Sequence, residues 1–294
     1  MPAVAVGTAR HRPWPRLSAQ GLLIAPALGL LGVFFVLPYL NLLLISFFTK
    51  SPQAPYLRVV TLGNYERLVT DAFTWGVVWR TLWLGAVTTA ICLIVSYPLA
   101  YHLARAPRGR KGALMVLVIS PLLVGVLIRT YGWMILLQDT GLINQALQSL
   151  GFAKLPLMYN RTGALIGLVH VFIPFMVLSI AASIQGIDPE LEMGARSLGA
   201  GAWRTFWRVT FPLSAHGVIA GTVLVFVLAV SSYVIPSLLG GYTVLTVPIL
   251  VVRTITELFN WPGGSAFAML FFGITLALLW LYLRALARVT RPVT

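Results

Sequence analysis

Long stretches without any Asp, Glu, Lys or Arg constrain this chain more than any other feature of its sequence. Five of them lie at residues 17–49, 81–104, 162–187, 209–252 and 258–283. A sixth, at residues 112–138, contains one charged residue, Arg129. A helix that crosses a bilayer needs about 20 consecutive residues that are mostly apolar. Each stretch is therefore long enough for a transmembrane helix.

The longest stretch is assigned one span, because Gly240, Gly241 and Pro248 interrupt it and leave one expected helix at residues 217–239. The first span, at residues 22–48, exceeds the roughly 7–15 apolar residues of a signal peptide, so we expect it to be retained. Only 10% of the 294 residues are charged, whereas soluble domains have about 25%. We predict an all-α, polytopic membrane protein with six transmembrane helices and no separate soluble domain.

Basic residues in the connections predict the orientation of the chain. With the N-terminus in the cytoplasm, the cytoplasmic side carries 13 Lys and Arg, including the cluster at 105–111, and the outer side carries 7. Cytoplasmic loops favour Lys and Arg, so we expect both termini in the cytoplasm. The predicted parts are a cytoplasmic tail at 1–18, a six-span region at 19–288 containing a cytoplasmic loop at 186–216, and a cytoplasmic tail at 289–294. On the outer side, residues 141–150 are expected to form a short amphipathic helix.

The cytoplasmic loop carries the signals of a short, well-defined helix. Asp188 suits the N-cap position, and Pro189 suits the first helical position, whose N–H has no partner within a helix. Glu190 and Glu192 follow in the first turn, where the helix dipole favours negative charge. Gly199 suits the left-handed position just beyond a helix end. We therefore expect a helix of about ten residues between these caps.

One face of this expected helix is apolar, because Leu191, Ala195 and Leu198 recur at helical spacing. A connection that only joins two membrane helices needs no such element. A capped helix with an apolar face in the cytoplasm therefore indicates a docking element for a soluble partner. The alternative is an interfacial helix without a partner, and the aromatic and basic residues at 203–208 would suit the membrane interface.

The loop resembles the EAA loop of permease subunits of binding-protein-dependent ABC importers. In that family Glu-Ala-Ala is followed by three residues, Gly, nine residues, Ile, one residue and Leu-Pro. Aligned on Gly199, this chain has Val209 in place of Ile and ends the motif with Phe211 and Pro212. The triplet differs, because residues 193–195 are Met-Gly-Ala and the glutamate is displaced by one position, to Glu192.

The resemblance implies a type I ABC importer permease fold in a bacterial inner membrane, and it implies several partners. These are a related second permease that completes a heterodimer, two ATP-binding subunits and an extracytoplasmic substrate-binding protein. ATP and Mg would bind to the ATPase subunits, and no cofactor is expected on this chain. The residues expected to contact or couple to the ATPase are Asp188, Glu192, Ala195, Arg196, Ser197, Leu198, Gly199 and Ala200.

Three further segments, at 96–105, 127–134 and 233–241, are similar to the spermidine/putrescine branch of this family, and within it to the first (PotB-type) permease subunit. This likeness implies import of a small amine, with polyamine as the first choice, by alternating access. The branch is also similar to importers of opines and aminophosphonates. A zwitterionic or anionic substrate therefore remains the alternative.

Several function classes lack their sequence signals. The chain has no phosphate-binding loop of the Gly-x-x-x-x-Gly-Lys-Ser/Thr type and no His-Glu-x-x-His motif. Its four His are scattered, its one Cys is Cys92, and no carboxylate lies inside a predicted span, so no metal site is expected. Membrane proteases and proton-coupled carriers need ionisable groups within the membrane. A non-catalytic subunit is expected, and copurification of an ATPase would separate it from a stand-alone channel, a carrier or a membrane enzyme.

Six residues are candidates for the substrate pathway: Arg129, Tyr131, Trp133, Asp139, Tyr233 and Glu257. On a straight helix Arg129 would lie roughly 25 Å from Gly112, near the outer boundary. It is either a gating residue or an arginine that reaches water or a backbone carbonyl. Asp139 and Glu257 are carboxylates at the outer ends of spans, and aromatic faces such as Tyr233 add cation–π contacts.

Each of these residues also has an ordinary structural explanation. Tyr131 and Trp133 suit the aromatic belt at the membrane interface. Asp139 and Glu257 are also explained as solvated loop carboxylates, and His170 is expected to be a hydrogen-bonded interior residue. A polycation would be repelled by Arg129. Three explanations would resolve this conflict: the partner permease supplies the acids, the path is wide and filled with water, or the substrate is zwitterionic or anionic.

Overall fold

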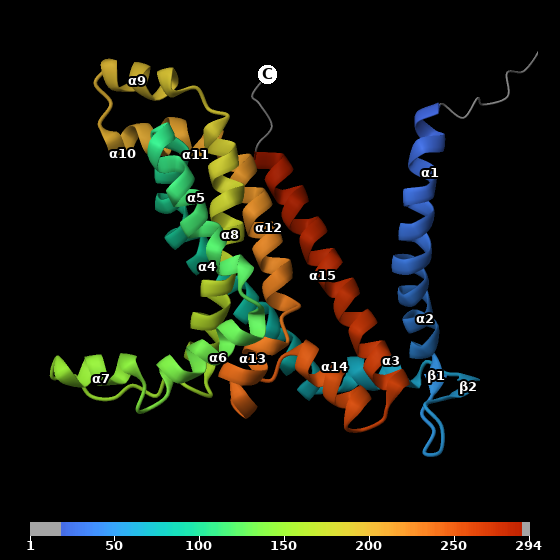
Figure 1. The fold of residues 1–294 in the computed structure, drawn as a ribbon. Coiled ribbons are helices and arrows are strands. Elements are labelled where there is room, and N and C mark those ends of the chain that lie inside the picture. Colours follow the sequence, from blue (N-terminus) through green and yellow to red (C-terminus); the bar gives the residue numbers. More distant parts are fainter. Residues whose placement is uncertain (1–18, 290–294) are drawn as a thin grey trace, which may run out of the picture.

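The computed structural model describes residues 19–289, which form almost only helices (Figure 1). At the centre, α4 (Ala72–Arg105), α8 (Arg161–Gln185) and α12 (Ala215–Val230) pack against one another. Together they contribute most of the buried apolar side chains of the larger core. The all-helical membrane architecture predicted from the charge-free stretches is confirmed, apart from one short hairpin.

Glycines allow the central helices to approach closely. A Cβ atom at Gly217 of α12 would collide with Ser183 of α8, and one at Gly221 would lie 2.7 Å from the sulfur of Met176. The hydroxyl of Ser179 donates a hydrogen bond of 3.1 Å to the carbonyl oxygen of Gly217 across the same interface. Small residues and interhelical hydrogen bonds of this kind are typical of helix packing in membranes.

Four helical segments are long and apolar enough to cross a membrane: Pro26–Ser46, Ala72–Arg105, Arg161–Gln185 and Trp261–Ala285. The first comprises the last part of α1 (Ala19–Leu31), from Pro26 onward, the π-helical turn η1 (Gly32–Val36) and α2 (Leu37–Ser46). The last lies in α15 (Trp261–Val289). α2 packs against α15, whereas α1 stands apart from the bundle (Figure 1). Within the described residues, counting each of two bent helix pairs as one span gives six, in agreement with the predicted number.

The third predicted span is not one straight helix. α5 (Arg108–Leu123) ends before Val124, and α6 (Val126–Leu137) begins after Gly125. The axis of Val126–Ser149 is turned by 94° from that of α5. Pro121 removes a hydrogen-bond donor from the last turn of α5, and Gly125 costs little steric strain in the break. The expected 25 Å offset of Arg129, which assumed a straight helix, is therefore wrong.

The fifth predicted span is also interrupted, so the expectation of one helix over 217–239 is wrong. α12 ends at Val230, and α13 (Val234–Leu239) is a separate helix that packs against α6 and α8. At the break the hydroxyl of Ser231 donates to the carbonyl oxygen of Val227 at 2.8 Å. Such side-chain bonds compete with the helical ladder, and Pro236 cannot donate to it.

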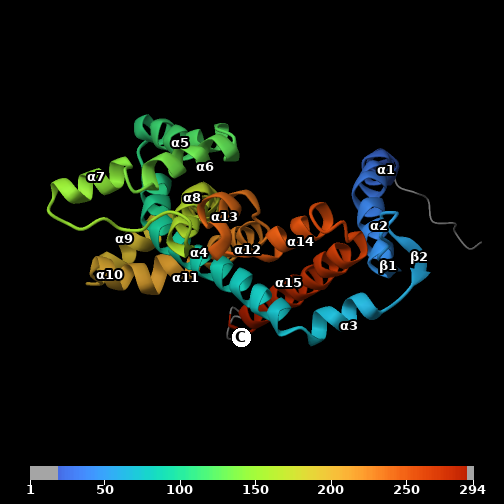
Figure 2. The same ribbon diagram turned by 90° about the horizontal axis from the view of Figure 1, so that it is seen from below.

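The remaining elements lie at the two ends of the bundle (Figures 1 and 2). At one end, which also holds the start of α1 and the end of α15, lie α9 (Pro189–Ser197), α10 (Ala202–Thr205), η2 (Phe206–Thr210) and α11 (Phe211–Leu213). The opposite end holds β1 (Phe48–Thr49), β2 (Leu57–Val60), α3 (Gly63–Thr70), α7 (Leu142–Ser149), η3 (Gly241–Thr243) and α14 (Val247–Thr256). β1 and β2 are antiparallel, with Phe48 opposite Val60. The short helix expected within 141–150 is confirmed as α7.

Candidate functional site

α9 is capped as its sequence predicts. The carboxylate of Asp188 accepts a hydrogen bond of 2.9 Å from the backbone N–H of Glu190, and Pro189 occupies the first helical position. Gly199 has φ = +84°, the left-handed conformation that ends the helix. The backbone N–H of Gly199 donates to the carbonyl of Arg196 at 2.9 Å. Local signals alone therefore fix both ends of this element.

The outer surface of α9 exposes large apolar side chains. Leu191 is 52% exposed, Met193 57% and Leu198 91%. Arg196 and Ser197 are exposed beside them, whereas Ala195 and Ala200 are half-buried. Burying a leucine side chain stabilises a protein or complex by about 1.5–3 kcal/mol. Covering this surface with another protein would therefore be favourable.

Glu192 lies on the opposite face, directed into the protein rather than toward a partner. Among the nine residues of α9, all of them described, it alone is buried. Its Oε1 accepts hydrogen bonds from Arg105 Nη2 at 2.9 Å and from Thr210 Oγ1 at 3.1 Å. Its Oε2 accepts one from the hydroxyl of Tyr101 at 2.9 Å. This carboxylate therefore joins α9 to α4 and η2.

Arg105 holds the entry to α9 as well. Its Nη1 donates a hydrogen bond of 3.0 Å to the carbonyl of Ile187, which lies between α8 and α9. Burial raises the pKa of Glu192, but hydrogen bonds from Arg105 and Tyr101 and the charge of Arg105 more than offset this and keep that pKa below its usual value. The carboxylate is therefore ionised at neutral pH.

Sequence reasoning treated Arg105 only as an orientation signal and missed this network. The usable signal is the four-residue spacing of Tyr97, Tyr101 and Arg105, which places them on one face of α4. The hydroxyls of Tyr97 and Ser214, the residue before α12, are 2.7 Å apart in a buried hydrogen bond. The phenol ring of Tyr97 also meets the ring of Phe206 edge-on at 5.2 Å. This face of α4 thus contacts α9, η2 and the start of α12.

An aromatic cluster follows α9 in the same loop. Trp203, Phe206, Trp207 and Phe211 form a continuous set of ring contacts with centroids 5.0–6.0 Å apart. Trp203 is 74% and Trp207 47% exposed, and Arg204 and Arg208 are exposed beside them. Exposed tryptophans with arginines are typical of a membrane interface.

Two of the expected pathway residues are engaged within the subunit. Arg129 Nη2 donates a hydrogen bond of 2.6 Å to the carbonyl oxygen of Val124. The ring of Trp133 packs edge-on against His170 at 5.2 Å. Arg129 therefore binds a backbone carbonyl, which was one of the two interpretations that its sequence position left open, and Trp133 faces α8.

Two other expected pathway residues come together at the end opposite α9. Tyr131 and Asp139 line an open cavity of about 630 Å³. The other polar side chains of its lining are Gln138, Thr140 and Tyr159. A carboxylate and two phenol rings in the lining of one cavity suit an ammonium group, which is attracted both by the charge and by the ring faces.

Tyr233 and Glu257 do not join this cavity. Tyr233 is 41% exposed and lies at the break between α12 and α13. Glu257 follows α14, and its Oε1 is 3.9 Å from Nε of Arg253 on the same helix. α7 and α14 point to opposite sides of the bundle (Figure 2). The six candidates therefore do not form one site in this subunit.

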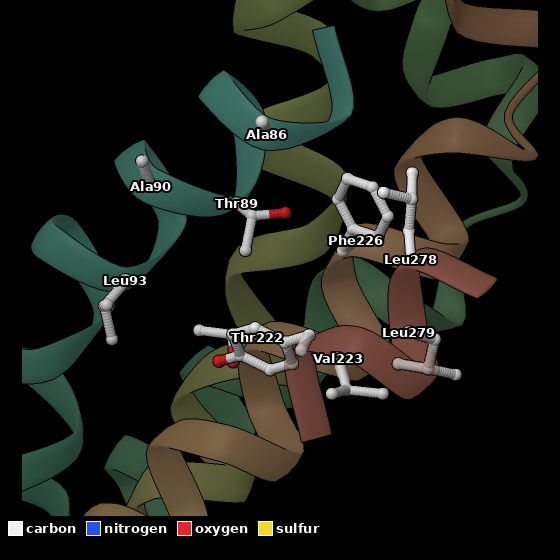
Figure 3. A pocket seen from close by; sticks show the side chains of 10 residues that line it. Ala86, Thr89, Ala90, Leu93, Thr222, Val223, Phe226, Leu278 and Leu279 are labelled. Atoms are coloured by element: carbon white, nitrogen blue, oxygen red, sulfur yellow. The ribbon is translucent and has the colours of Figure 1, made fainter. Parts of the chain in front are cut away.

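A second cavity, of about 340 Å³, lies between α4, α12 and α15 and is almost entirely apolar (Figure 3). Its main polar feature is a hydrogen bond of 2.7 Å between the hydroxyls of Thr222 and Tyr282. No charged side chain lines it, so it offers nothing to a cation. Within residues 19–289, no three His, Cys, Asp or Glu side chains are grouped to hold a metal ion.

Comparison with known proteins gives a consistent set of relatives. The family described as "binding-protein-dependent transport system inner membrane component" matches residues 110–292. The spermidine/putrescine transport system permease protein PotB of Haemophilus influenzae is 34% identical over 264 residues, which cover 89% of this chain and 92% of the relative. PotB of Escherichia coli K12 is 34% identical over 246 residues, covering 83% and 89% of the two chains.

Solved structures share the fold at lower sequence identity. A chain of a bacterial alginate ABC transporter, crystallised with an alginate-bound periplasmic protein, matches with a TM-score of 0.78 and 16% identity over 94% of this chain and 97% of that one. A chain of the MetNI methionine ABC transporter, in an inward-facing conformation, matches with a TM-score of 0.53 and 16% identity over 76% of this chain and 99% of that one. The arrangement of helices is therefore that of an ABC transporter membrane subunit.

Proposed function

Because the chain belongs to the family of binding-protein-dependent transport system inner membrane components, we propose that it is the permease subunit of an ATP-driven importer of polyamines such as spermidine and putrescine. The observation that carries the proposal is α9, a capped helix that exposes Leu191, Met193 and Leu198 at one end of the bundle. An ATPase seated on this surface would act on the membrane helices from the cytoplasm. The 34% identity to PotB over most of the chain supports the polyamine substrate.

The proposed assembly has three kinds of protein partner around this chain. A related second permease completes the transmembrane pathway, two ATP-binding subunits supply ATP and Mg sites, and a binding protein delivers substrate on the outer side. This chain itself binds no cofactor. The excess of Lys and Arg on the α9 side supports the placement of both termini in the cytoplasm, as does the start of α1 and the end of α15 at that side (Figure 1).

The cavity at Asp139 supports an amine substrate from the outer side. It presents a carboxylate, an amide and two phenol groups toward open space. Arg129, the one charged residue within the apolar stretch at 112–138, donates a hydrogen bond to the carbonyl oxygen of Val124. Arg129 is not among the residues that line this cavity, whereas Asp139 is, so the charged side chain in the lining is the carboxylate.

The test is uptake of labelled spermidine by bacteria that carry the complete transporter, with and without this chain. We expect loss of uptake on deletion and competition by unlabelled putrescine but not by opines or aminophosphonates. If the complex assembles with its ATPase and spermidine is not taken up, the polyamine assignment is wrong. Uptake of a labelled aminophosphonate by the same cells would then favour the anionic or zwitterionic alternative.

A further inference from the structure

We propose that the ion pair of Arg105 and Glu192 is the connection through which movement of α9 reaches the transmembrane core. This inference rests on the proposed function, because it requires an ATPase that displaces α9. It concerns the last residue of α4 and a residue of α9, whose side chains meet with Nη2 of Arg105 at 2.9 Å from Oε1 of Glu192. Glu192 thereby acts as a positioning residue rather than as a contact for the ATPase.

The first support is the way in which α9 is held. Its large apolar side chains are exposed, and the only side chain that it buries is the charged Glu192. A cavity of about 150 Å³ lies next to Tyr101 and Thr210, which both bond Glu192; its other lining residues are Arg196, Ala202, Thr205 and Phe206. α9 is therefore attached by a few directional polar contacts next to unfilled space, and it has room to tilt about them.

The second support is where those contacts lead. Arg105 and Tyr101 belong to the last two turns of α4, one of the three central helices. On the same face of α4, the hydroxyl of Tyr97 bonds Ser214 at the start of α12. The carbonyl oxygen of Ile187, two residues after the end of α8, also accepts a hydrogen bond from Arg105. A displacement of Glu192 would therefore move the end of α4. That end of α4 is hydrogen-bonded to Ile187, which follows α8, and to Ser214, which precedes α12.

The third support is chemical. Both oxygens of Glu192 are already used within the chain, by Arg105, Tyr101 and Thr210. Removing one member of a buried ion pair leaves an uncompensated charge, which is strongly unfavourable. The pair therefore resists separation when a partner moves α9, whereas contacts between apolar surfaces can slide.

The test uses the complete complex of full-length chains in liposomes, with Glu192→Gln, Arg105→Gln and the charge-exchanged pair Arg105→Glu with Glu192→Arg. Arg108→Gln is the matched control, because Arg108 is an exposed arginine only three residues after Arg105, at the start of α5. Hydrogen exchange is measured in α9 and in residues 97–105, before and after a non-hydrolysable ATP analogue is added. Spermidine uptake per ATP hydrolysed is the second readout.

In the unmodified complex the nucleotide should change exchange in both segments. In the two single variants the ATPase should still copurify and α9 should still respond. The response of residues 97–105 should be lost, and uptake per ATP should fall about tenfold, a typical size for the loss of coupling between two sites. The charge-exchanged pair should recover part of both, since hydroxyls at positions 101 and 210 can also accept hydrogen bonds from an arginine. Arg108→Gln should behave as the unmodified chain.

An unchanged response at residues 97–105 in both single variants overturns the inference, as does an equal loss in Arg108→Gln. If the single variants no longer bind the ATPase, the charge-exchanged pair decides: recovery of binding and response supports the inference, and no recovery overturns it. The exchange readout needs no substrate. Absence of spermidine uptake by the unmodified complex would therefore count against the polyamine assignment alone.

Discussion

Arg129 donates a hydrogen bond of 2.6 Å from its Nη2 to the carbonyl oxygen of Val124, the residue at which the helix of the apolar stretch 112–138 breaks. A break in a helix frees carbonyl groups that have no partner within the helix. In a membrane such groups must be satisfied by other parts of the protein. The single charge in this stretch thus supplies a donor where the backbone needs one.

Replacement of Arg129 should destabilise the bend between α5 and α6. In Arg129→Met the carbonyl of Val124 loses its partner, at a cost of about 1–3 kcal/mol. Arg129→Lys keeps a donor and should lose less. The measurement is the midpoint of thermal unfolding of the detergent-solubilised complex. A midpoint unchanged in Arg129→Met would show that this hydrogen bond does not hold the bend.

Gly199 should be required for the end of α9 because of its backbone conformation rather than for lack of space. At φ = +84° a Cβ atom would meet no atom within 4 Å, so Gly199→Ala tests conformation alone, with an expected cost of about 1–2 kcal/mol. Gly201→Ala is the matched control, since Gly201 has φ = −64° and equally open surroundings. Copurification of the ATPase should fall for Gly199→Ala and, more strongly, for Gly199→Asp, with normal membrane insertion. Equal copurification by the two alanine variants would contradict the expectation.

Leu198 should contribute to ATPase binding without contributing to folding, because its side chain is 91% exposed. If a partner buries it, Leu198→Asp removes about 1.5–3 kcal/mol of apolar burial, which corresponds to a loss of affinity of roughly tenfold to a hundredfold. Leu142→Asp, a 65% exposed leucine on α7 at the opposite end, is the control. Affinity is measured by titration of the purified ATPase onto the permease pair in detergent. An affinity that stays the same in Leu198→Asp would remove this face of α9 from the interface.

The capped helix could be predicted from the sequence because its signals are local. Asp188 and Gly199 act on the backbone within a few residues of themselves, so their effect does not depend on the rest of the fold. The two helix breaks were missed for the opposite reason. The apolar stretches that contain Val124 and Ser231 are long enough for one helix. Pro121 and Pro236 weaken the helix near each break, but prolines also occur inside unbroken helices such as α4 and α8, so packing of α6 and α13 decides that the chain turns there.

The role of Glu192 could not be predicted because it depends on a contact between distant segments. Its partner Arg105 lies 87 residues earlier in the chain. In the sequence each residue has a sufficient local explanation, a first-turn acid for one and an orientation signal for the other. Only the fold of α4 against the loop brings the two charges together and turns the glutamate inward.

Asp139 should attract the amine substrate through its charge. Two unit charges about 4 Å apart in water interact with about 1 kcal/mol, so Asp139→Asn should raise the apparent KM for spermidine about fivefold and weaken its dependence on salt. Glu66→Gln, an exposed carboxylate on α3 at the same end, is the control. Uptake is measured as a function of spermidine concentration at two ionic strengths. A KM that does not change in Asp139→Asn would return this residue to the role of a solvated loop carboxylate.

The attachment of α9 should be insensitive to pH down to values below the ordinary pKa of a glutamate. The groups that face Glu192 are Arg105, Tyr101 and Thr210, with Arg196 near Tyr101. Burial raises the pKa of Glu192, but the hydrogen bonds and the charge of Arg105 hold that pKa below its ordinary value in the folded protein. A group whose pKa is lowered by folding stabilises the folded state above its unfolded pKa of about 4.3, and that contribution is lost as the pH falls through the folded pKa.

The difference in thermal midpoint between the unmodified chain and Glu192→Gln should therefore stay constant from pH 8 to about pH 5 and shrink only in stronger acid. A difference that already shrinks between pH 8 and pH 6 would mean that Glu192 takes up a proton near neutrality, and that Arg105 does not hold it as an ion pair.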